Sequence, residues 1–162
     1  MPSSSQERVV AVIPARMGSS RFPGKPLTPI KGRSMVEHVY KRVALCQRVD
    51  EGVYIATPDN EIARVVEDFG GQVIMTSPSH QRASDRVAEV AESMEADIFV
   101  LIQGDEPMVV PAMIDGLVVD LLGRHVLHGS DQGADVGLQR SDRHVAVGAA
   151  GNSKVDNLGL TA

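Results

Sequence analysis

The 162-residue sequence contains one cysteine, no apolar run that approaches the length of a membrane span, and no excess of basic residues. Cys46 has no second cysteine with which to form an internal disulfide, and residues 1–8 lack the apolar stretch of a signal peptide. These features predict a protein of the reducing cytoplasm with no membrane partner. The formal net charge of −5 argues against nucleic-acid binding, which needs a basic face. We expect Cys46, in an amphipathic helical pattern, to be a small core residue and not a nucleophile.

Residues 123–162 also lack proline, glutamate, isoleucine, methionine and aromatic residues, and they contain seven of the 15 glycines. Such a segment can bury little apolar surface, so we expect a poorly ordered, glycine-rich tail that is distinct from residues 1–122. Its abrupt change of composition suggests a truncated or frameshifted product, which reading the coding DNA in its other frames would test. The histidines of the tail, His125, His128 and His144, are irregularly spaced and have no cysteine nearby, so solvated side chains are favoured over a metal site. Val145–Val147 gives the tail a hint of a strand.

Residues 1–122 alternate between strand and helix patterns. Buried strands are predicted at 9–13, 53–57, 72–76 and 98–102, and helices at 34–43, 59–69, 84–94 and 111–122. Ser34 and Glu37 form a capping box, Asp59 can cap the next helix, and Pro111 suits a first helical position. This alternation predicts an α/β fold with a doubly wound, mostly parallel sheet. Ligands bind such sheets at the carboxyl ends of the strands.

The loop after the first strand, residues 14–27, carries Arg16, Arg21 and Lys25 together with two glycines and two serines. Glycine allows close backbone approach and exposes amide groups, while the cations supply the charge that a polyphosphate needs. A P-loop is excluded because Gly18 and Gly24 enclose five residues and a proline follows Lys25, where that motif needs serine or threonine. A dinucleotide fingerprint is absent too. The remaining alternative is a solvated loop, but prolines and aligned cations favour a triphosphate cradle.

A second motif, Gln103-Gly104-Asp105-Glu106-Pro107, directly follows the fourth predicted strand. Carboxylates in a tight turn at this end of a sheet suit Mg²⁺, which takes one or two carboxylates plus phosphate oxygens. Asp105 would then hold the metal, and Gln103 could hydrogen-bond an acceptor substrate without adding charge. Alternatively, Asp105 and Glu106 cap the helix that begins near Pro111, although Asp105 lies several residues too early for that.

A third motif, His80 to Arg86, follows the third predicted strand. Ser84 and Asp85 make a plausible helix start, whose free amide groups suit a nucleotide or a phosphate. It is equally consistent with Ser84 as a simple N-cap and Arg86 as a surface cation. This segment alone does not separate the two interpretations.

Taken together and in this order, the three motifs resemble the 3-deoxy-manno-octulosonate (Kdo) cytidylyltransferases, also called CMP-Kdo synthetases. The resemblance covers residues 8–120, and the combination of P-A-R…S-S-R-F-P-G-K-P-L with Q-G-D-E-P is far more specific than either part. Sialic-acid cytidylyltransferases share the P-A-R start but are less similar through R-F-P-G-K-P. Polysaccharide-biosynthesis nucleotidyltransferases share A-R-M-G-S-S-R-like loops but usually lack the Q-G-D-E-P turn. The resemblance implies a nucleotide-diphosphosugar transferase (Rossmann-like) fold. It also implies transfer of CMP from CTP to the anomeric hydroxyl of Kdo, in lipopolysaccharide precursor synthesis, with release of pyrophosphate.

The resemblance also implies roles for individual residues. Arg16, Arg21 and Lys25 would bind the triphosphate, Asp105 would bind Mg²⁺, and Gln103 would face the sugar. The catalytic set would be Arg16, Lys25 and Asp105, with no separate base if the metal lowers the pKa of the hydroxyl. The family pattern also suggests a homodimer. The nucleotide-binding set would comprise Pro14, Ala15, Arg16, Ser19, Arg21, Lys25, Gln81, Ser84 and Arg86.

Three departures from the family pattern bear on activity. Ala83 stands where the family commonly has glycine, beside an added cation, Arg82, which puts base or sugar preference in question. Pro58 interrupts a stretch that usually runs directly from threonine to aspartate. The tail matches neither the second metal-binding aspartate nor the sugar-binding and dimer-forming half of the family, although Val155-Asp156 faintly resembles one of its segments. The alternatives are therefore an active cytidylyltransferase, a CTP-binding fragment without turnover, or a nucleotidyltransferase for another acidic sugar.

Overall fold

The computed structural model describes residues 7–18, 21–129, 144–148 and 154–156, and their framework is a six-stranded sheet. The two central strands are apolar runs: β1 (Val9–Pro14) is buried over its first five residues and β6 (Ile98–Ile102) over all five. Such runs suit strands that are covered on both faces. The other strands are β4 (Val53–Thr57), β5 (Gln72–Met75), β7 (His144–Gly148) and β8 (Lys154–Asp156).

The strands lie in the order β5-β4-β1-β6-β7-β8. All neighbours from β5 to β7 pair in parallel, and β8 pairs antiparallel to β7. The helices are α1 (Met35–Val43), α2 (Asn60–Asp68), α3 (Ala83–Ser93) and α4 (Pro111–Gly129). The predicted α/β fold with a doubly wound, mostly parallel sheet is confirmed.

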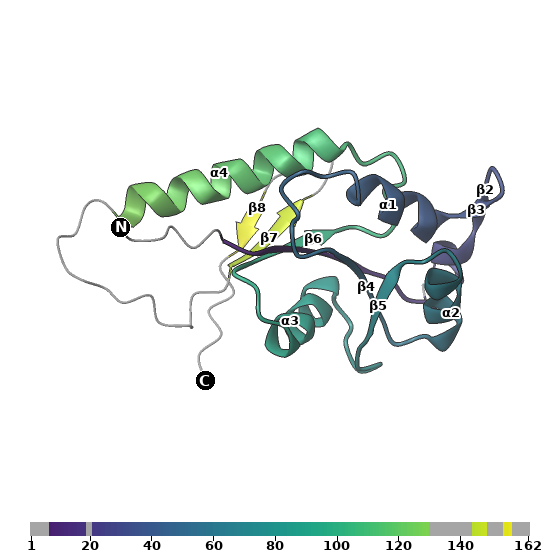
Figure 1. Cartoon of the computed structure of the whole chain (residues 1–162). Coiled ribbons are helices and arrows are strands. Elements are labelled where there is room, and N and C mark those ends of the chain that lie inside the picture. Colours follow the sequence, from purple (N-terminus) through teal and green to yellow (C-terminus); the bar gives the residue numbers. More distant parts are fainter. Residues whose placement is uncertain (1–6, 19–20, 130–143, 149–153, 157–162) are drawn as a thin grey trace.

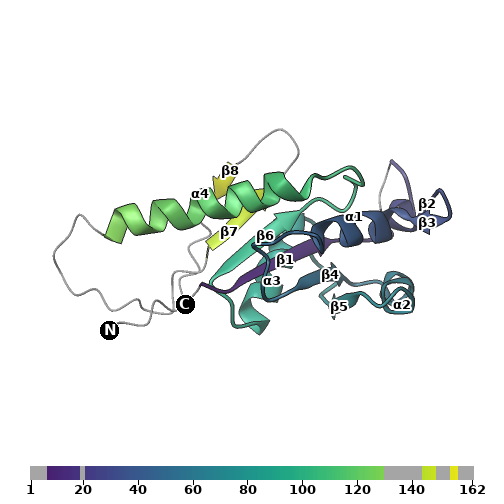
Figure 2. The same ribbon diagram turned by 45° about the horizontal axis from the view of Figure 1, so that its top comes forward.

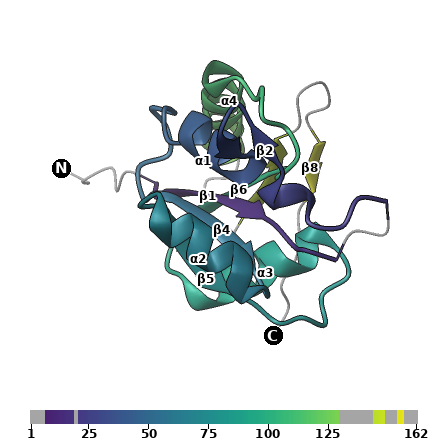
Figure 3. The ribbon, with the colours of Figure 1, turned by 90° about the vertical axis from the view of Figure 1, so that its right-hand side faces the viewer.

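Helices cover both faces of the sheet. Figures 1, 2 and 3 show α1 and α4 on one side and α3 on the other. One buried cluster contains alternate residues of β1 together with Val36 of α1, Ile62 of α2 and Ile114 of α4. Val87 and Val90 of α3 join the intervening residues of β1 in a second cluster. Burial on both faces of β1 and β6 fixes the register of the sheet where the two strands meet.

The start of α1 agrees with the sequence, while two other helix boundaries differ from it. The Ser34 hydroxyl accepts a hydrogen bond from the Glu37 amide at 3.3 Å, as in the predicted capping box. The third predicted helix begins at Ala83 and not at Ser84, which lies in its first turn. The fourth helix does not end at Leu122 but continues to Gly129.

Cys46 lies outside the predicted helical pattern, because α1 ends at Val43. Its thiol is half-buried, packs against the first core cluster and donates to the Pro111 carbonyl over 3.7 Å. Burial, with a smaller contribution from the charge of Asp115, raises the pKa of the Cys46 thiol to about 11. A thiol that stays protonated is a poor nucleophile, as expected.

Three further short elements between β1 and α1 were not predicted. Lys25–Leu27 form a single 3-10 turn, and β2 (Pro29–Ile30) pairs antiparallel with β3 (Arg33–Ser34). In the tail, the hint of a strand at Val145–Val147 is confirmed by β7, whereas β8 was not predicted. The division into residues 1–122 and 123–162 stays a prediction, since much of the tail lies outside the described residues. Among the described helices, none is long and apolar enough to cross a membrane.

Two glycine substitutions test the packing of the helices. In Gly116→Ala, which lies within α4, nothing lies within 4 Å of the added methyl group. We expect the free energy of unfolding to rise by about 0.5–1 kcal/mol, because alanine has a higher helix propensity than glycine. In Gly71→Ala, the methyl group would lie 2.6 Å from Phe69 Cε2 and 2.8 Å from Val66 Cγ1, and the protein loses stability. Urea unfolding measures both, and a stabilised Gly71→Ala variant would contradict the described packing beneath the end of α2.

Candidate functional site

The strand order places a crevice between the ends of β1 and β6. From β1 the chain winds outward through β4 and β5, then crosses back to β6 on the other side of β1. The loops that follow β1 and β6 therefore diverge at the point where the winding reverses. In open α/β sheets, ligands bind at this switch point, outside the carboxyl ends of the strands.

A cavity of about 310 Å³ occupies this position, at the lower end of the range for small-molecule sites. Four segments line it: the end of β1 with the residues that follow it, the 3-10 turn, the entry to α3, and the turn after β6. Four of the lining side chains are arginine or lysine, against a single carboxylate, so the cavity suits a polyanion. The lining residues are Pro14, Ala15, Arg16, Lys25, Pro26, His80, Gln81, Arg82, Ala83, Arg86, Gln103, Gly104 and Asp105.

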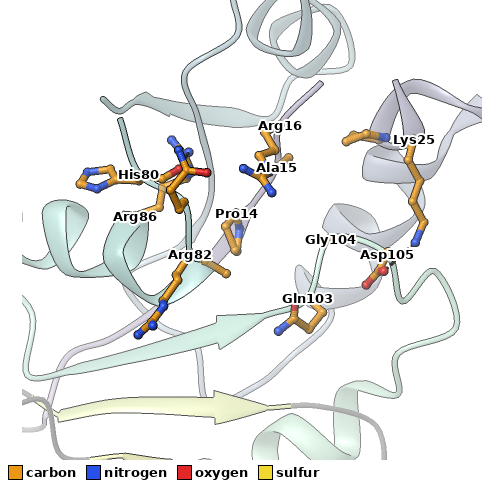
Figure 4. Close-up of a pocket in the computed structure, with 13 residues that line it drawn as sticks. Pro14, Ala15, Arg16, Lys25, His80, Arg82, Arg86, Gln103, Gly104 and Asp105 are labelled. Carbon is orange, nitrogen blue, oxygen red and sulfur yellow. Dashed lines mark hydrogen bonds and ion pairs between the residues drawn. The ribbon is translucent and has the colours of Figure 1, made fainter. Parts of the chain in front are cut away.

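An ion pair joins the first two predicted motifs on one side of the cavity. Lys25 Nζ lies 2.6 Å from Asp105 Oδ2, although the two residues are 80 positions apart in the sequence. Figure 4 shows this pair on one side of the cavity and His80 and Arg86 on the other, with Pro14 between them. Both side chains of the pair stay partly exposed, 37% for Lys25 and 50% for Asp105, so solvent and ligand can reach them. An ion pair this exposed contributes little to stability.

Gly104 brings the turn after β6 against the end of β1. A Cβ atom at this position would lie only 2.8 Å from the carbonyl oxygen of Pro14. Only glycine permits this approach without moving one of the two segments. Gly104 was quoted in the second motif but was not predicted as a site residue, because a close backbone approach leaves no sign in a single sequence beyond the glycine itself.

Asp59 makes a structural contact next to the site that the sequence analysis missed. It was predicted to cap α2, and it does stand at the N-cap position, but its side chain makes no capping hydrogen bond. Instead, Asp59 Oδ2 accepts from the Met17 amide at 2.7 Å, across 42 positions of sequence. The Asp59 amide in turn donates to the Thr57 hydroxyl at 3.1 Å. Asp59 thus fastens the residues after β1 to the end of β4. An aspartate two residues after the end of a parallel strand was the available signal.

Most of the predicted binding residues do line the cavity. Arg21 and Ser84 do not, and Ser19 lies outside the described residues. Arg21 is exposed, and Ser84 lies one residue inside α3, between the lining residues Ala83 and Arg86. Some lining residues were not predicted, although they belong to the same motifs as the predicted ones. They are Pro26, His80, Arg82, Ala83 and Gly104.

Arg86 is the most buried cation of the site, with 3% of its surface exposed. Its guanidinium donates to the Thr76 hydroxyl, to the Ser77 carbonyl at 3.2 Å and to the His80 carbonyl at 3.4 Å. Burial, more than the charge of Arg16, lowers the pKa of Arg86. Nearby Glu89 opposes that shift. Arg86 therefore lines the cavity while its donors hold the preceding loop.

Comparison with known proteins matches residues 10–137 to the model of the cytidylyltransferase family. The chain is 50% identical over 115 residues to the 3-deoxy-manno-octulosonate cytidylyltransferase of Geobacter metallireducens, covering 71% of this chain and 45% of that protein. It is 54% identical over 111 residues to the enzyme of the same name from Myxococcus xanthus, covering 68% and 45%. The chain thus spans about half the length of the curated relatives it matches.

A solved structure gives the same relationship in three dimensions. The fold matches that of a CMP:2-keto-3-deoxy-manno-octonic acid synthetase complexed with CTP, with a TM-score of 0.70 and 44% identity. The match covers 72% of this chain and 48% of the synthetase. The likeness in three dimensions thus extends over most of this chain.

The close approach at Gly104 predicts a steric effect in Gly104→Ala. We expect the variant to lose about 1–3 kcal/mol of unfolding free energy, as overpacked sites do, because a backbone carbonyl cannot rotate away as a side chain can. Gly18→Ala is the matched control, since nothing lies within 4 Å of its added methyl group. Urea unfolding compares the two, and equal stabilities would count against the described contact.

The Asp59 hydrogen bond predicts a difference between two substitutions. Asp59→Ala leaves the Met17 amide without its acceptor, and we expect faster hydrogen exchange there and a loss of about 1–3 kcal/mol in unfolding free energy. Asp59→Asn keeps an acceptor oxygen and should retain most of the protection. Amide hydrogen exchange at Met17, measured by NMR, compares the two variants with the wild type. Unchanged protection in Asp59→Ala would refute the role given to Asp59.

Proposed function

The chain belongs to the cytidylyltransferase family, and from that premise we propose that it binds CTP and transfers CMP to 3-deoxy-D-manno-octulosonate (Kdo). The anomeric hydroxyl of the sugar attacks the α-phosphorus, and pyrophosphate leaves. Support comes from the relatives and from the solved structure, all of which carry this activity in their names. We further propose that the product serves lipopolysaccharide synthesis in the cytoplasm. A single cysteine without a disulfide partner is consistent with that reducing compartment.

The single observation that carries the proposal is the Lys25–Asp105 ion pair in a cavity rich in cations. It brings an anion-binding side chain and a candidate metal ligand within 2.6 Å of each other at the switch point of the sheet. Phosphoryl transfer depends mainly on positioning and on neutralising the charge of the leaving group. A cationic cradle beside one accessible carboxylate provides the groups for both.

The roles proposed for the binding residues combine their places around the cavity with the resemblance of the motifs. Arg16, Arg21 and Lys25 bind the triphosphate in this proposal, and Gln103, at the end of β6, faces the sugar. The nucleotide-binding set is Pro14, Ala15, Arg16, Ser19, Arg21, Lys25, Gln81, Ser84 and Arg86. Arg21 and Ser84 belong to this set through the resemblance of the motifs, since neither lines the cavity.

Asp105 has the chemistry of a Mg²⁺ ligand. Its carboxylate is half-exposed and lies in the cavity where the phosphates of CTP would lie. In the described part of the chain, no three histidine, cysteine, aspartate or glutamate side chains gather around a possible metal position. That suits Mg²⁺, which often binds through one or two carboxylates and completes its shell with phosphate oxygens and water. The ion would offset negative charge on the leaving pyrophosphate.

The main alternative is a CTP-binding chain without turnover. It rests on residues 123–162, which do not match the family segment that carries a second metal-binding aspartate. Homodimer formation likewise stays a prediction. A different acidic sugar as acceptor is the third possibility, because the substituted positions Arg82 and Ala83 both line the cavity.

A turnover assay separates these functions. The purified chain is incubated with CTP, Mg²⁺ and Kdo, pyrophosphate release is followed, and CTP binding is measured by calorimetry. Binding with release supports the transferase, and binding without release supports the inactive alternative. Release only when Kdo is replaced by another acidic sugar would change the substrate. A folded protein that binds no CTP at all would refute the proposal.

The ion pair predicts effects of opposite sign in two metal conditions. Without Mg²⁺, Asp105→Asn should bind CTP more tightly than the wild type, because the variant removes a negative charge and releases Lys25. With Mg²⁺, the same variant should bind less tightly, because the metal loses its carboxylate. Calorimetry with CTP in EDTA and in Mg²⁺ measures both, and a variant that keeps the full Mg²⁺ effect would exclude Asp105 as a ligand.

Lys25→Met should weaken CTP binding about tenfold or more in both conditions, the cost of one charge-assisted hydrogen bond. Lys41→Met is the matched control: Lys41 is an exposed lysine that pairs with Glu37 on α1 and does not line the cavity. Equal affinities for the two lysine variants would remove Lys25 from the triphosphate site.

A further inference from the structure

The loop of residues 76–82, between β5 and α3, is fastened to α3 by two charged side chains. Arg86 and Glu89 lie three positions apart and so share a face of the helix. Arg86 donates hydrogen bonds to two backbone carbonyls of the loop, those of Ser77 and His80. Glu89 contacts two nitrogen atoms of the loop, the Ser77 amide and His80 Nε2. The loop in turn supplies His80, Gln81 and Arg82 to the cavity.

The Glu89 carboxylate makes its contacts at the start and the middle of this loop. It accepts from the Ser77 amide at 3.0 and 3.3 Å and contacts His80 Nε2 at 2.5 Å. The Ser77 amide, followed by His80, lowers the pKa of Glu89, so the acceptor is charged at neutral pH. Glu89 also interacts favourably with the buried Arg86 guanidinium. Neither Glu89 nor Ser77 lines the cavity.

We propose that Glu89 is a positioning residue for nucleotide binding, which fixes the 76–82 loop as one wall of the cavity through Ser77 and His80. The proposal rests on the proposed function and deepens it. The cavity has two sides, with Lys25 and Asp105 on one and His80 and Arg86 on the other (Figure 4). The triphosphate groups bind on the first side, and the nucleoside uses the wall that Glu89 holds.

This division of the cavity gives a readout that general destabilisation would not produce. Inorganic tripolyphosphate offers only the charges of CTP and engages the cationic loop after β1, whereas CTP needs both sides. Loss of the Glu89 contacts should therefore weaken CTP binding and leave tripolyphosphate binding unchanged. A variant that is merely less stable would lose both ligands together.

Two variants of Glu89 and one control make the test. Glu89→Met keeps the length and helix propensity of the side chain but removes its acceptors, and Glu89→Gln keeps a neutral, weaker acceptor. Glu92→Gln is the control, on an exposed position of the same helix. The measurements are calorimetry with CTP and with tripolyphosphate, and amide hydrogen exchange at Ser77.

We expect Glu89→Met to bind CTP about tenfold more weakly, equivalent to the hydrogen bonds that the loop loses, with unchanged tripolyphosphate affinity and faster exchange at Ser77. Glu89→Gln should lie between this variant and the wild type in its CTP affinity and in its exchange rate at Ser77. Glu92→Gln should match the wild type in both. If Glu89→Met does not fold, Glu89→Gln alone decides, through a smaller CTP loss and faster Ser77 exchange.

Unchanged CTP affinity in the folded Glu89 variants would overturn the positioning role, and so would equal losses of CTP and tripolyphosphate affinity. A wild-type chain that binds tripolyphosphate but not CTP would instead overturn the proposed function on which the role rests. The wild-type measurement thus separates the two failures.

Discussion

The site depends on one constraint, the parallel pairing of β1 with β6. Both strands are buried on their two faces, and their register runs from Val9 opposite Ile98 to Val12 opposite Leu101. A slip of one residue would turn every core side chain of β6 to the opposite face, so the core fixes the register. The register in turn sets Gly104 against the carbonyl of Pro14, which brings the two loops close enough for the Lys25–Asp105 ion pair.

The net charge of the chain is negative although the cavity is cationic, because acidic side chains lie mainly outside the cavity. Several carboxylates accept hydrogen bonds from backbone amides at the ends of strands and in loops, outside the cavity. There they meet donors that would otherwise lack partners, and their charge lies away from the ligand position. The pairs are Asp97 with Arg8, Asp50 with Val9, Asp59 with Met17, Asp115 with Gln47 and Arg48, and Glu89 with Ser77.

The sequence alone was enough to predict the α/β class and the principal strands, because buried parallel strands are uninterrupted apolar runs and the helices between them carry ordinary start signals. Its three motifs also contain all four segments that line the cavity. What it missed depends on contacts between distant residues. Asp59 has the sequence context of a helix cap, yet its carboxylate bonds an amide 42 positions away. Glu89 looks like any surface glutamate of an amphipathic helix until the loop folds back onto it.

The cavity is thus shaped mainly by backbone that is held from outside the lining, with Arg86 as a lining side chain that also holds a loop. Arg16, Gln81 and Arg82, which face the cavity, are exposed, and long exposed side chains bring little order to the loops that carry them. Order comes from carboxylates outside the lining, Asp59 for the residues after β1 and Glu89 for the entry to α3. A ligand that enters such a site orders side chains but does not have to order the loops, and that lowers the entropic cost of binding. The same reasoning explains why two acidic residues support a site for an anion: their carboxylates accept hydrogen bonds from backbone amides, and neither carboxylate lines the cavity.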